Sequence, residues 1–198
     1  MDVRQQLRKR LREQRRSLSA HERKRFSEQL AKNFAKTKLF RNSKHIAFYL
    51  ANDGELDLLP LMQIAWRMKK HCYLPILSPP FQQHMLYFAR YQKGDPLSLN
   101  QFAIAEPRVS PRHWRTGRRL NLVLTPLVAF DARGNRLGMG GGYYDRTFAY
   151  LRHQHRWRRP RLAGIAYDFQ QVDRLERSSW DVPLSTIATP RKYIVCER

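Results

Sequence analysis

Residues 120–146 read LNLVLTPLVAFDARGNRLGMGGGYYDR, and they give the clearest local signals of the fold. The apolar run 120–125, ended by Pro126, predicts a buried strand. Five of the nine glycines follow between residues 134 and 142, and a helix is predicted from residue 143 to about 153. A strand, a glycine-rich loop and a helix in this order are typical of an anion site, because backbone amides and the helix dipole favour negative charge there.

Helices and strands alternate along the rest of the chain. A basic amphipathic helix is predicted over residues 2–17, and a capping box from Ser19 to Glu22 begins a second helix that reaches about Thr37. Further predictions are a helix from Asp57 to about Lys70, strands over 45–50, 72–77, 85–89 and 162–166, and short strands at Ile187 and 194–195. Because Pro75 interrupts its strand, we expect that strand to lie at a sheet edge or to end early.

The alternation predicts the fold class. We expect one α/β domain over residues 1–198, a single layered domain with a mostly parallel central sheet flanked by helices. The basic helix over residues 2–17 is expected to pack on it.

Composition excludes some classes of protein. Hydrophobic residues make up 42% of the chain, enough for a packed core, and no apolar run approaches the ~20 residues of a membrane span. The N-terminus lacks the apolar segment of a signal peptide, and its apolar residues Val3, Leu7 and Leu11 favour a folded helix over a transit peptide. Cys72 and Cys196 lack metal-binding spacing and are expected to be reduced, structural thiols. We expect a cytoplasmic monomer that makes no use of a membrane.

The net charge is +22, from 38 Lys and Arg against 16 Asp and Glu. Such a charge implies affinity for nucleotides, polycarboxylates or nucleic acid, or simply a solvated basic surface. A basic nucleic-acid-binding protein is therefore one hypothesis, supported by the first helix and by the tract RHQHRWRRPR over residues 152–161. No helix-turn-helix, zinc-finger or RNA-binding signature accompanies these features, so any nucleic-acid binding is expected to be non-specific.

The glycine-rich loop matches neither common nucleotide-binding pattern. No Gly-Lys-Ser/Thr follows it, as a Walker A loop requires, and Tyr143 stands where the dinucleotide fingerprint needs its last glycine. An ordinary glycine-rich turn is the alternative. A ligand site is favoured by the position of the loop after a strand end, where open α/β sheets keep their ligand crevices.

A resemblance narrows the possibilities. TPLVAFD over residues 125–131, with GNRLGMGGGYYDR after it, closely resembles the signature of the 5-formyltetrahydrofolate cyclo-ligase family. The resemblance extends over nearly the whole chain, through RQQLR at 4–8, DGELD at 53–57, GIAYD at 164–168 and WDVPL at 180–184. It implies an enzyme that closes 5-formyltetrahydrofolate to 5,10-methenyltetrahydrofolate while hydrolysing ATP with Mg²⁺. One departure is Gly141, where many members carry a lysine; Arg136 or Arg146 would then supply that charge.

The resemblance also implies which residues bind the nucleotide. The ATP site would consist of Arg4, Arg8, Arg136, Leu137, Gly138, Met139, Gly140, Gly141, Gly142, Tyr143 and Tyr144. Arg136, Tyr144 and Arg146 would be the catalytic residues, since phosphoryl transfer depends on positioning and charge neutralisation. From the sequence alone, Arg4 and Arg8 are equally compatible with a solvated helix face.

Magnesium would be held by Asp145 and Asp181, because Mg²⁺ needs few protein carboxylates when phosphates and waters complete its shell. The folate substrate, with or without a polyglutamate tail, would contact Leu50, Glu55, Met139, Gly140, Gly142 and Tyr143. Glu55 would face the pterin, whose adjacent N–H donors suit a carboxylate. Structural alternatives stay open: Asp145 as a first-turn acid, Asp181 as a turn cap, Glu55 as a solvated acid and Leu50 as sheet core.

Overall fold

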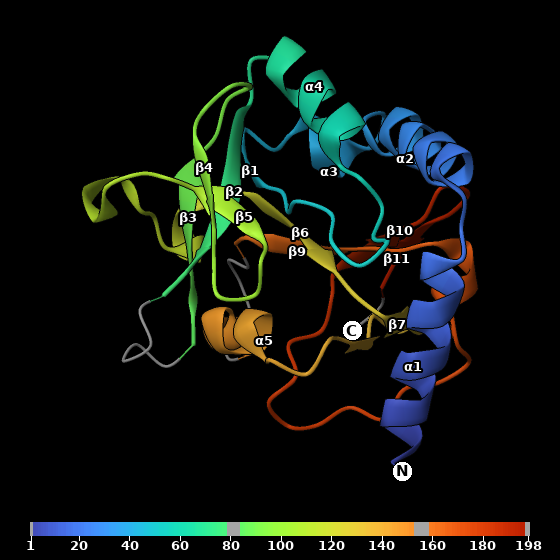
Figure 1. Cartoon of the computed structure of the whole chain (residues 1–198). Helices are drawn as coiled ribbons and strands as arrows, with labels where there is room; N and C mark the ends of the chain where they lie inside the picture. The colour runs from blue at the N-terminus through green and yellow to red at the C-terminus, as the bar shows by residue number, and fades with distance from the viewer. Residues whose placement is uncertain (1, 79–83, 153–158, 197–198) are drawn as a thin grey trace.

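The computed structural model describes residues 2–78, 84–152 and 159–196, and its centre is a seven-stranded sheet (Figure 1). Across the sheet the strands are β3 (Leu86–Arg90), β2 (His71–Leu77), β1 (His45–Ala47), β6 (Leu122–Pro126), β9 (Arg161–Ile165), β10 (Thr186–Ala188) and β11 (Tyr193–Val195). The five inner strands are parallel, and the edge strands β3 and β11 are antiparallel to their neighbours. The predicted α/β fold with a mostly parallel sheet is confirmed.

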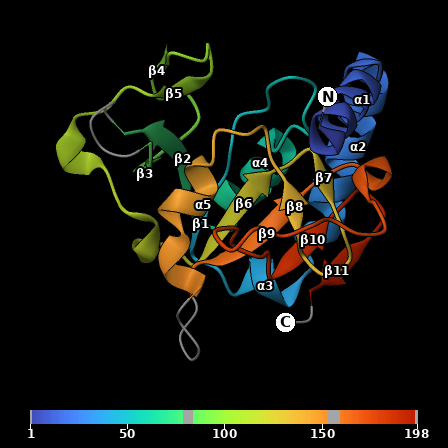
Figure 2. The same cartoon turned by 90° about the horizontal axis from the view of Figure 1, so that it is seen from below.

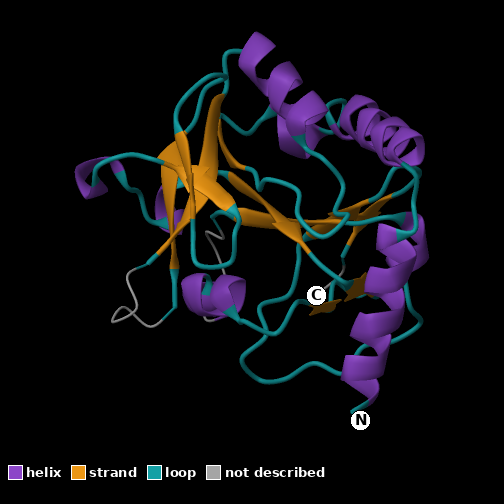
Figure 3. Cartoon of the chain, in the orientation of Figure 1, coloured by secondary structure: helices purple, strands orange, loops and turns teal. Residues whose placement is uncertain are grey.

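Helices lie on both faces of this sheet (Figures 2 and 3). They are α1 (Val3–Arg16), α2 (Ala20–Phe34), α3 (Lys38–Arg41), α4 (Leu59–Arg67) and α5 (Tyr143–Thr147). Ile46 and Leu124 pack in a core with α2, α3 and α4, whereas Ala47 and Val123 pack in a second core that includes Tyr144 of α5. Successive residues of a strand thus face opposite helical layers, as the two-residue period of a strand requires.

Smaller elements connect these layers. They are the hairpin of β4 (Leu97–Leu99) and β5 (Ala105–Pro107), the hairpin of β7 (Ala129–Phe130) and β8 (Arg136–Leu137), and the 3-10 turns η1 (Pro111–His113), η2 (Gly117–Arg119), η3 (Ala149–Arg152) and η4 (Asp168–Gln170). The sequence pattern predicts neither hairpin, because each of these strands has only two or three residues.

The strand order reverses between β1 and β6. From β1 the chain proceeds to β2 and β3 on one side; it returns to β6 on the other side of β1 and continues to β9, β10 and β11. Open α/β sheets bind ligands beside the carboxyl ends of their strands at such a reversal. The turn that contains Glu55 follows β1 and the glycine-rich loop follows β6, so both candidate segments leave the sheet at this point.

The strand that contains Pro75, β2, does not lie at a sheet edge, contrary to the prediction, and runs unbroken between β1 and β3. β1 is short and ends opposite Tyr73, so no strand flanks Pro75 on that side. Phe88, which faces Pro75 on β3, directs its own backbone hydrogen bonds to Arg115 instead. The missing N–H of the proline therefore leaves no ladder bond unmade.

Two elements end earlier than predicted. α2 ends at Phe34 rather than Thr37, because the Thr37 hydroxyl caps the separate helix α3. β1 ends at Ala47 rather than Leu50, because the chain there turns away from both neighbouring strands toward the acidic turn. The predicted capping box between Ser19 and Glu22 is confirmed.

The boundaries of α4 and α5 also differ. α4 begins after Leu58, and the predicted cap Asp57 accepts the N–H of Leu59 instead of occupying the cap position. α5 ends at Thr147 and η3 replaces the next turn, because the following residue leaves the helical conformation. The predicted end of this helix at His153, like most of the basic tract, lies outside the described residues.

Both cysteines are buried free thiols, as predicted. Burial raises the pKa of Cys72 to about 12 and that of Cys196 to about 11, so neither is a reactive thiolate at neutral pH. Among the described residues, no helix is both long enough and apolar enough to cross a membrane.

Candidate active site

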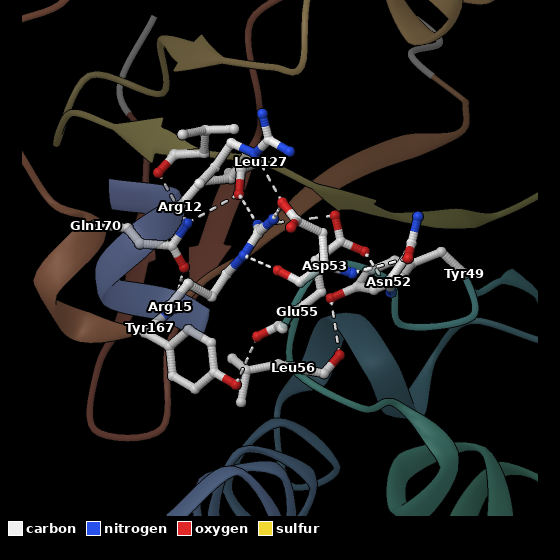
Figure 4. Close-up of polar contacts among 12 residues, drawn as sticks. Arg12, Arg15, Tyr49, Asn52, Asp53, Glu55, Leu56, Leu127, Tyr167 and Gln170 are labelled. Carbon is white, nitrogen blue, oxygen red and sulfur yellow. Dashed lines mark hydrogen bonds and ion pairs between the residues drawn. The ribbon is translucent and has the colours of Figure 1, made fainter. Parts of the chain in front are cut away.

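The acidic turn after β1 is held by side chains from three parts of the chain (Figure 4). Its carbonyl groups accept hydrogen bonds as follows: Asp53 from Arg15 Nε at 2.7 Å, Gly54 from the Tyr167 hydroxyl at 3.1 Å and Leu56 from the Tyr49 hydroxyl at 3.1 Å. Gly54 has a φ of 76°, and a Cβ there would lie 3.0 Å from the Arg15 carbonyl oxygen. Glycine is needed here both for the left-handed backbone and for the close approach of α1.

Arg15 joins α1 to this turn and to the segment after β6. Its side chain is only 1% exposed, and Nη2 lies 2.7 Å from Asp53 Oδ2. Nη1 lies 3.5 Å from the Leu127 carbonyl oxygen and 3.8 Å from Glu55 Oε1. Gln170 Nε2 donates to the same Leu127 carbonyl at 2.9 Å. The carboxyl ends of β1 and β6 are therefore tied to one another through α1 (Figure 4).

The two carboxylates of the turn have opposite electrostatic environments. Burial alone would raise the pKa of Asp53, but hydrogen bonds from Arg12, Arg16 and Arg15 outweigh it and lower that pKa to about 2. Burial raises the pKa of Glu55 to about 7, although the charge of Arg15 opposes the shift. Asp53 is therefore a permanent anion that anchors α1, whereas Glu55 titrates near neutral pH.

The glycine-rich loop begins as the turn of the β7–β8 hairpin. Asp131 is fully buried, and its carboxylate accepts the backbone N–H groups of Arg133, Asn135 and Leu175. Gly134 has a φ of 86°, and a Cβ there would lie 2.7 Å from the Leu184 carbonyl oxygen. This first part of the loop is thus structural.

The second part of the loop, residues 138–142, faces open space. Gly140 and Gly142 have φ values of 106° and 63°, a backbone that other residues rarely adopt. A Cβ placed on Gly138 or Gly140 would meet no atom within 4 Å, and the Met139 side chain is exposed. This segment leads directly into the first turn of α5, which is the arrangement that exposes amides to an anion.

α1 contacts the open part of the loop through Arg8. Its Nε donates to the Gly138 carbonyl at 2.9 Å. Burial and the neighbouring charge of Arg4 lower the pKa of Arg8, so the two predicted nucleotide-binding arginines lie near each other. A depression of about 230 Å³ extends along the helix and is lined by Gln5, Arg8, Lys9, Arg12, Glu13 and Arg16.

The predicted metal ligands approach the same region from α5 and from the segment before β10. Asp145 Oδ1 accepts from Arg136 Nη2 at 2.5 Å and from the backbone N–H of Val182 at 3.0 Å. Asp181, the residue before Val182, accepts the N–H of Ser178 through Oδ2 at 2.8 Å. Among the described residues, Oδ2 of Asp145 and Oδ1 of Asp181 have no hydrogen-bond partner, so each carboxylate keeps one oxygen available.

No group of three or more His, Cys, Asp or Glu side chains with metal-binding geometry occurs in the described part of the chain. The chemistry of Asp145 and Asp181 fits a hard cation that takes only one or two protein carboxylates. Arg136 is 6% exposed and also donates to the Val182 carbonyl, so it links both segments.

Tyr143 and Tyr144, at the start of α5, make different contacts. Burial and the nearby carboxylate of Glu55 raise the pKa of Tyr144, which places this tyrosine beside the acidic turn. The guanidinium of Arg146 lies 5.5 Å from the centre of the Tyr143 ring, and its nitrogens donate to the carbonyl groups of Gly141 and His84. Arg146 is exposed, whereas the side chain of Arg136 is only 6% exposed.

The predicted site residues gather beside the carboxyl ends of the parallel strands. Arg8 meets the loop, Asp145 meets the backbone beside Asp181, and Tyr144 lies near Glu55. Leu50 is half-buried and packs against the core that includes α2 and α4, and Leu137 is buried beside α1. The ligand roles of these residues stay predictions.

Sequence reasoning missed the side chains that hold the acidic turn. Arg15 had a recognisable signal, because it continues the apolar stripe of Leu7 and Leu11 at helical spacing, where a charged residue needs a buried partner. Tyr49 and Tyr167 had none, because each contacts a carbonyl group whose position only the tertiary fold determines.

Comparisons with known proteins identify the family of the chain. Residues 1–190 match the 5-formyltetrahydrofolate cyclo-ligase family. The chain is 39% identical to 5-formyltetrahydrofolate cyclo-ligase of Haemophilus influenzae, over 93% of this chain and 96% of that one. It is 37% identical to the Escherichia coli K12 protein of the same name, over 92% and 97%. The NMR structure of Aquifex aeolicus 5,10-methenyltetrahydrofolate synthetase has a TM-score of 0.81 at 30% identity, covering 100% of this chain and 94% of that one.

Proposed function

This chain belongs to the 5-formyltetrahydrofolate cyclo-ligase family, and from that premise we propose that it converts 5-formyltetrahydrofolate into 5,10-methenyltetrahydrofolate, with ATP hydrolysed to ADP and phosphate. It is an enzyme of the ligase class. One observation supports the proposal most directly: the turn that contains Glu55 follows β1, the loop over residues 138–142 follows the β7–β8 hairpin that extends from the adjacent parallel strand β6, and α1 contacts both.

The proposed chemistry needs an activated leaving group. The formyl oxygen attacks the γ-phosphorus of ATP and ADP leaves, which converts a poor leaving group into a phosphate ester on an iminium carbon. The neighbouring nitrogen of the folate itself then attacks that carbon and loses its proton, and phosphate departs as the five-membered ring closes. Such a reaction depends on positioning and charge neutralisation rather than on a protein nucleophile.

The loop and α1 supply the groups for the nucleotide. The open backbone of residues 138–142 can direct amides at phosphate oxygens, since no side chain blocks Gly138 or Gly140. Arg8 already contacts the loop, and Arg136, whose side chain is 6% exposed, is paired with Asp145 of α5. We assign to Arg136 the charge that a lysine at position 141 supplies in many members of the family, because Arg146 is exposed.

Asp145 and Asp181 would hold Mg²⁺, with ATP phosphates and waters as the remaining ligands. The ion, when bound, neutralises phosphate charge. Arg136 shares Asp145 Oδ1 with the Val182 N–H and leaves Oδ2 available for the cation. The arginine thus orients the carboxylate and would itself lie near the phosphates.

Glu55 would accept the adjacent N–H groups of the pterin. Its side chain is 13% exposed and fixed by a hydrogen bond that Oε2 accepts from the Asn52 N–H at 3.1 Å. Tyr144, close to this carboxylate, would lie between the folate and the nucleotide. We further propose that the protein acts as a monomer and accepts folates with or without a polyglutamate tail, for which the charge of +22 would favour capture.

Purified protein mixed with 5-formyltetrahydrofolate tests the proposal through the absorbance of the methenyl product. The absorbance should rise only with both ATP and Mg²⁺, with one ADP formed for each methenyl group. No rise at any pH, or a rise without ATP, would refute the proposed reaction. A protein that fails this assay but binds nucleic acid with a steep salt dependence would fit the alternative of a nucleic-acid-binding protein.

A further inference from the structure

Arg15 is the side chain on which the contacts between α1 and the acidic turn converge. It is 1% exposed, and its three guanidinium nitrogens point at three different groups: the Asp53 backbone, the Asp53 carboxylate, and the pair formed by the Leu127 carbonyl and Glu55 (Figure 4). Its own backbone carbonyl oxygen would lie 3.0 Å from a Cβ on Gly54, which is tighter than most contacts of a real Cβ. A side chain held in this way cannot move without moving the turn.

We infer that Arg15 is a positioning residue for folate binding: it fixes the turn that presents Glu55 and supplies the cation beside that carboxylate, from the same helix that contacts the glycine-rich loop through Arg8. The inference rests on the proposed function, in which Glu55 binds the folate. Arg15 itself is too buried and too fully bonded within the protein to contact a substrate.

The ionisation of Glu55 depends on few charged groups. Those that face it are Arg15 from α1, Asp53 from the turn, Tyr49 after β1, Tyr144 from α5 and Tyr167 after β9, with Arg136 beyond Tyr144. Asp53 is ionised and disfavours the Glu55 carboxylate, and the tyrosines are neutral at pH 7. Arg15 is therefore the cation that directly favours the charged form against burial.

A matched control lies on the same helix. Arg16 also bonds the Asp53 carboxylate, yet its side chain is 55% exposed and, among the described residues, it contacts neither Glu55 nor Leu127. Replacing Arg16 removes one cation and one hydrogen bond to Asp53, whereas replacing Arg15 removes one cation and two hydrogen bonds to Asp53. Only the Arg15 substitution removes the cation beside Glu55.

Equilibrium binding of 5-formyltetrahydrofolate to full-length protein without nucleotide, followed by calorimetry between pH 5.5 and 9, tests the inference (about 0.5-unit steps resolve the titration). The wild-type Kd should rise as the pH falls through about 7, where Glu55 becomes protonated. Arg15→Gln should move this midpoint up by about one pH unit and raise Kd at pH 7 by about fivefold or more. Arg16→Gln should leave the midpoint unchanged and Kd within about twofold.

Arg15→Lys provides the second variant, for use also if Arg15→Gln does not fold. An ammonium group keeps the charge but cannot reach three groups at once, so the midpoint should stay near that of wild type while Kd rises. A shared midpoint and Kd for the Arg15 and Arg16 glutamine variants, or a lysine variant identical to wild type, would overturn the role of Arg15 alone. Wild-type protein that binds no folate would instead overturn the proposed function, and this inference with it.

Discussion

Replacing Glu55 by glutamine should stabilise the fold at alkaline pH while it weakens folate binding. Burial holds the pKa of Glu55 near 7, against an ordinary value of 4.5. At about 1.4 kcal/mol for each pKa unit, the ionised carboxylate destabilises the folded state by about 3 kcal/mol. Glutamine keeps an oxygen for the Asn52 N–H, and Arg15 keeps Asp53 as its counter-ion, so no buried charge is left unpaired.

The direction of the pKa shift determines how the stability difference between variant and wild type changes with pH. A carboxyl group with a raised folded-state pKa binds its proton more tightly in the folded protein, so its contribution is most favourable below pH 4.5 and is lost as the pH rises through 7. The difference in unfolding free energy between Glu55→Gln and wild type should therefore be small near pH 5 and reach about 3 kcal/mol at pH 8.

Urea unfolding, followed by tryptophan fluorescence at several pH values, measures this difference, provided both proteins have the same m-value. A variant that is no more stable than wild type at pH 8, or a difference that does not change between pH 5 and 8, would refute the reasoning. The same variant should show a raised KM for folate, since the pterin loses a charged acceptor. Stability given up at a binding site is a common feature of enzymes.

Three further predictions concern the loop, the metal ligand and the anchor of α1. Asp145→Asn should lower kcat by about tenfold or more and shift the Mg²⁺ titration of activity to higher concentration; unchanged kinetics would exclude Asp145 as a ligand. Gly140→Val should weaken ATP binding by about tenfold or more, because valine is strained at a φ of 106°, and it should not unfold the protein, because the site faces open space. Gly138→Ala should change ATP binding little; equal effects of the two substitutions would contradict the loop assignment. The low pKa of Asp53 contributes stability above about pH 4, and wild-type protein should lose this stability as the pH falls from about 4 to about 2. Asp53→Asn should not show this loss in acid unfolding, and identical acid transitions would argue against the role of Asp53 as an anchor.

Local patterns predicted most of the fold. Apolar runs located the strands of the central sheet, and the capping box located the start of α2, because these signals depend on neighbouring residues. Pro75 was misassigned because its tolerance depends on where β1 ends, which is a property of a different segment. The hairpin of β7 and β8 was missed because it relies on the buried carboxylate of Asp131 rather than on strand propensity.

The candidate site divides in the same way. The loop over residues 138–142 stood out from glycine content alone, whereas Glu55 and Asp181 were identified only through resemblance to the family. Arg15 was overlooked because its partners lie 38 residues and more away in the chain. The local sequence shows only one sign of such a side chain, which is a cation at a position of the apolar stripe of α1.

A structure of this protein with Mg-ADP bound would show directly where the nucleotide lies. The diphosphate should lie against the backbone amides of residues 138–142, within reach of Arg8, with the metal ion on Asp145 and Asp181. A nucleotide seated instead along the outer face of α1, or a metal ion held by neither aspartate, would contradict the proposed nucleotide and metal sites.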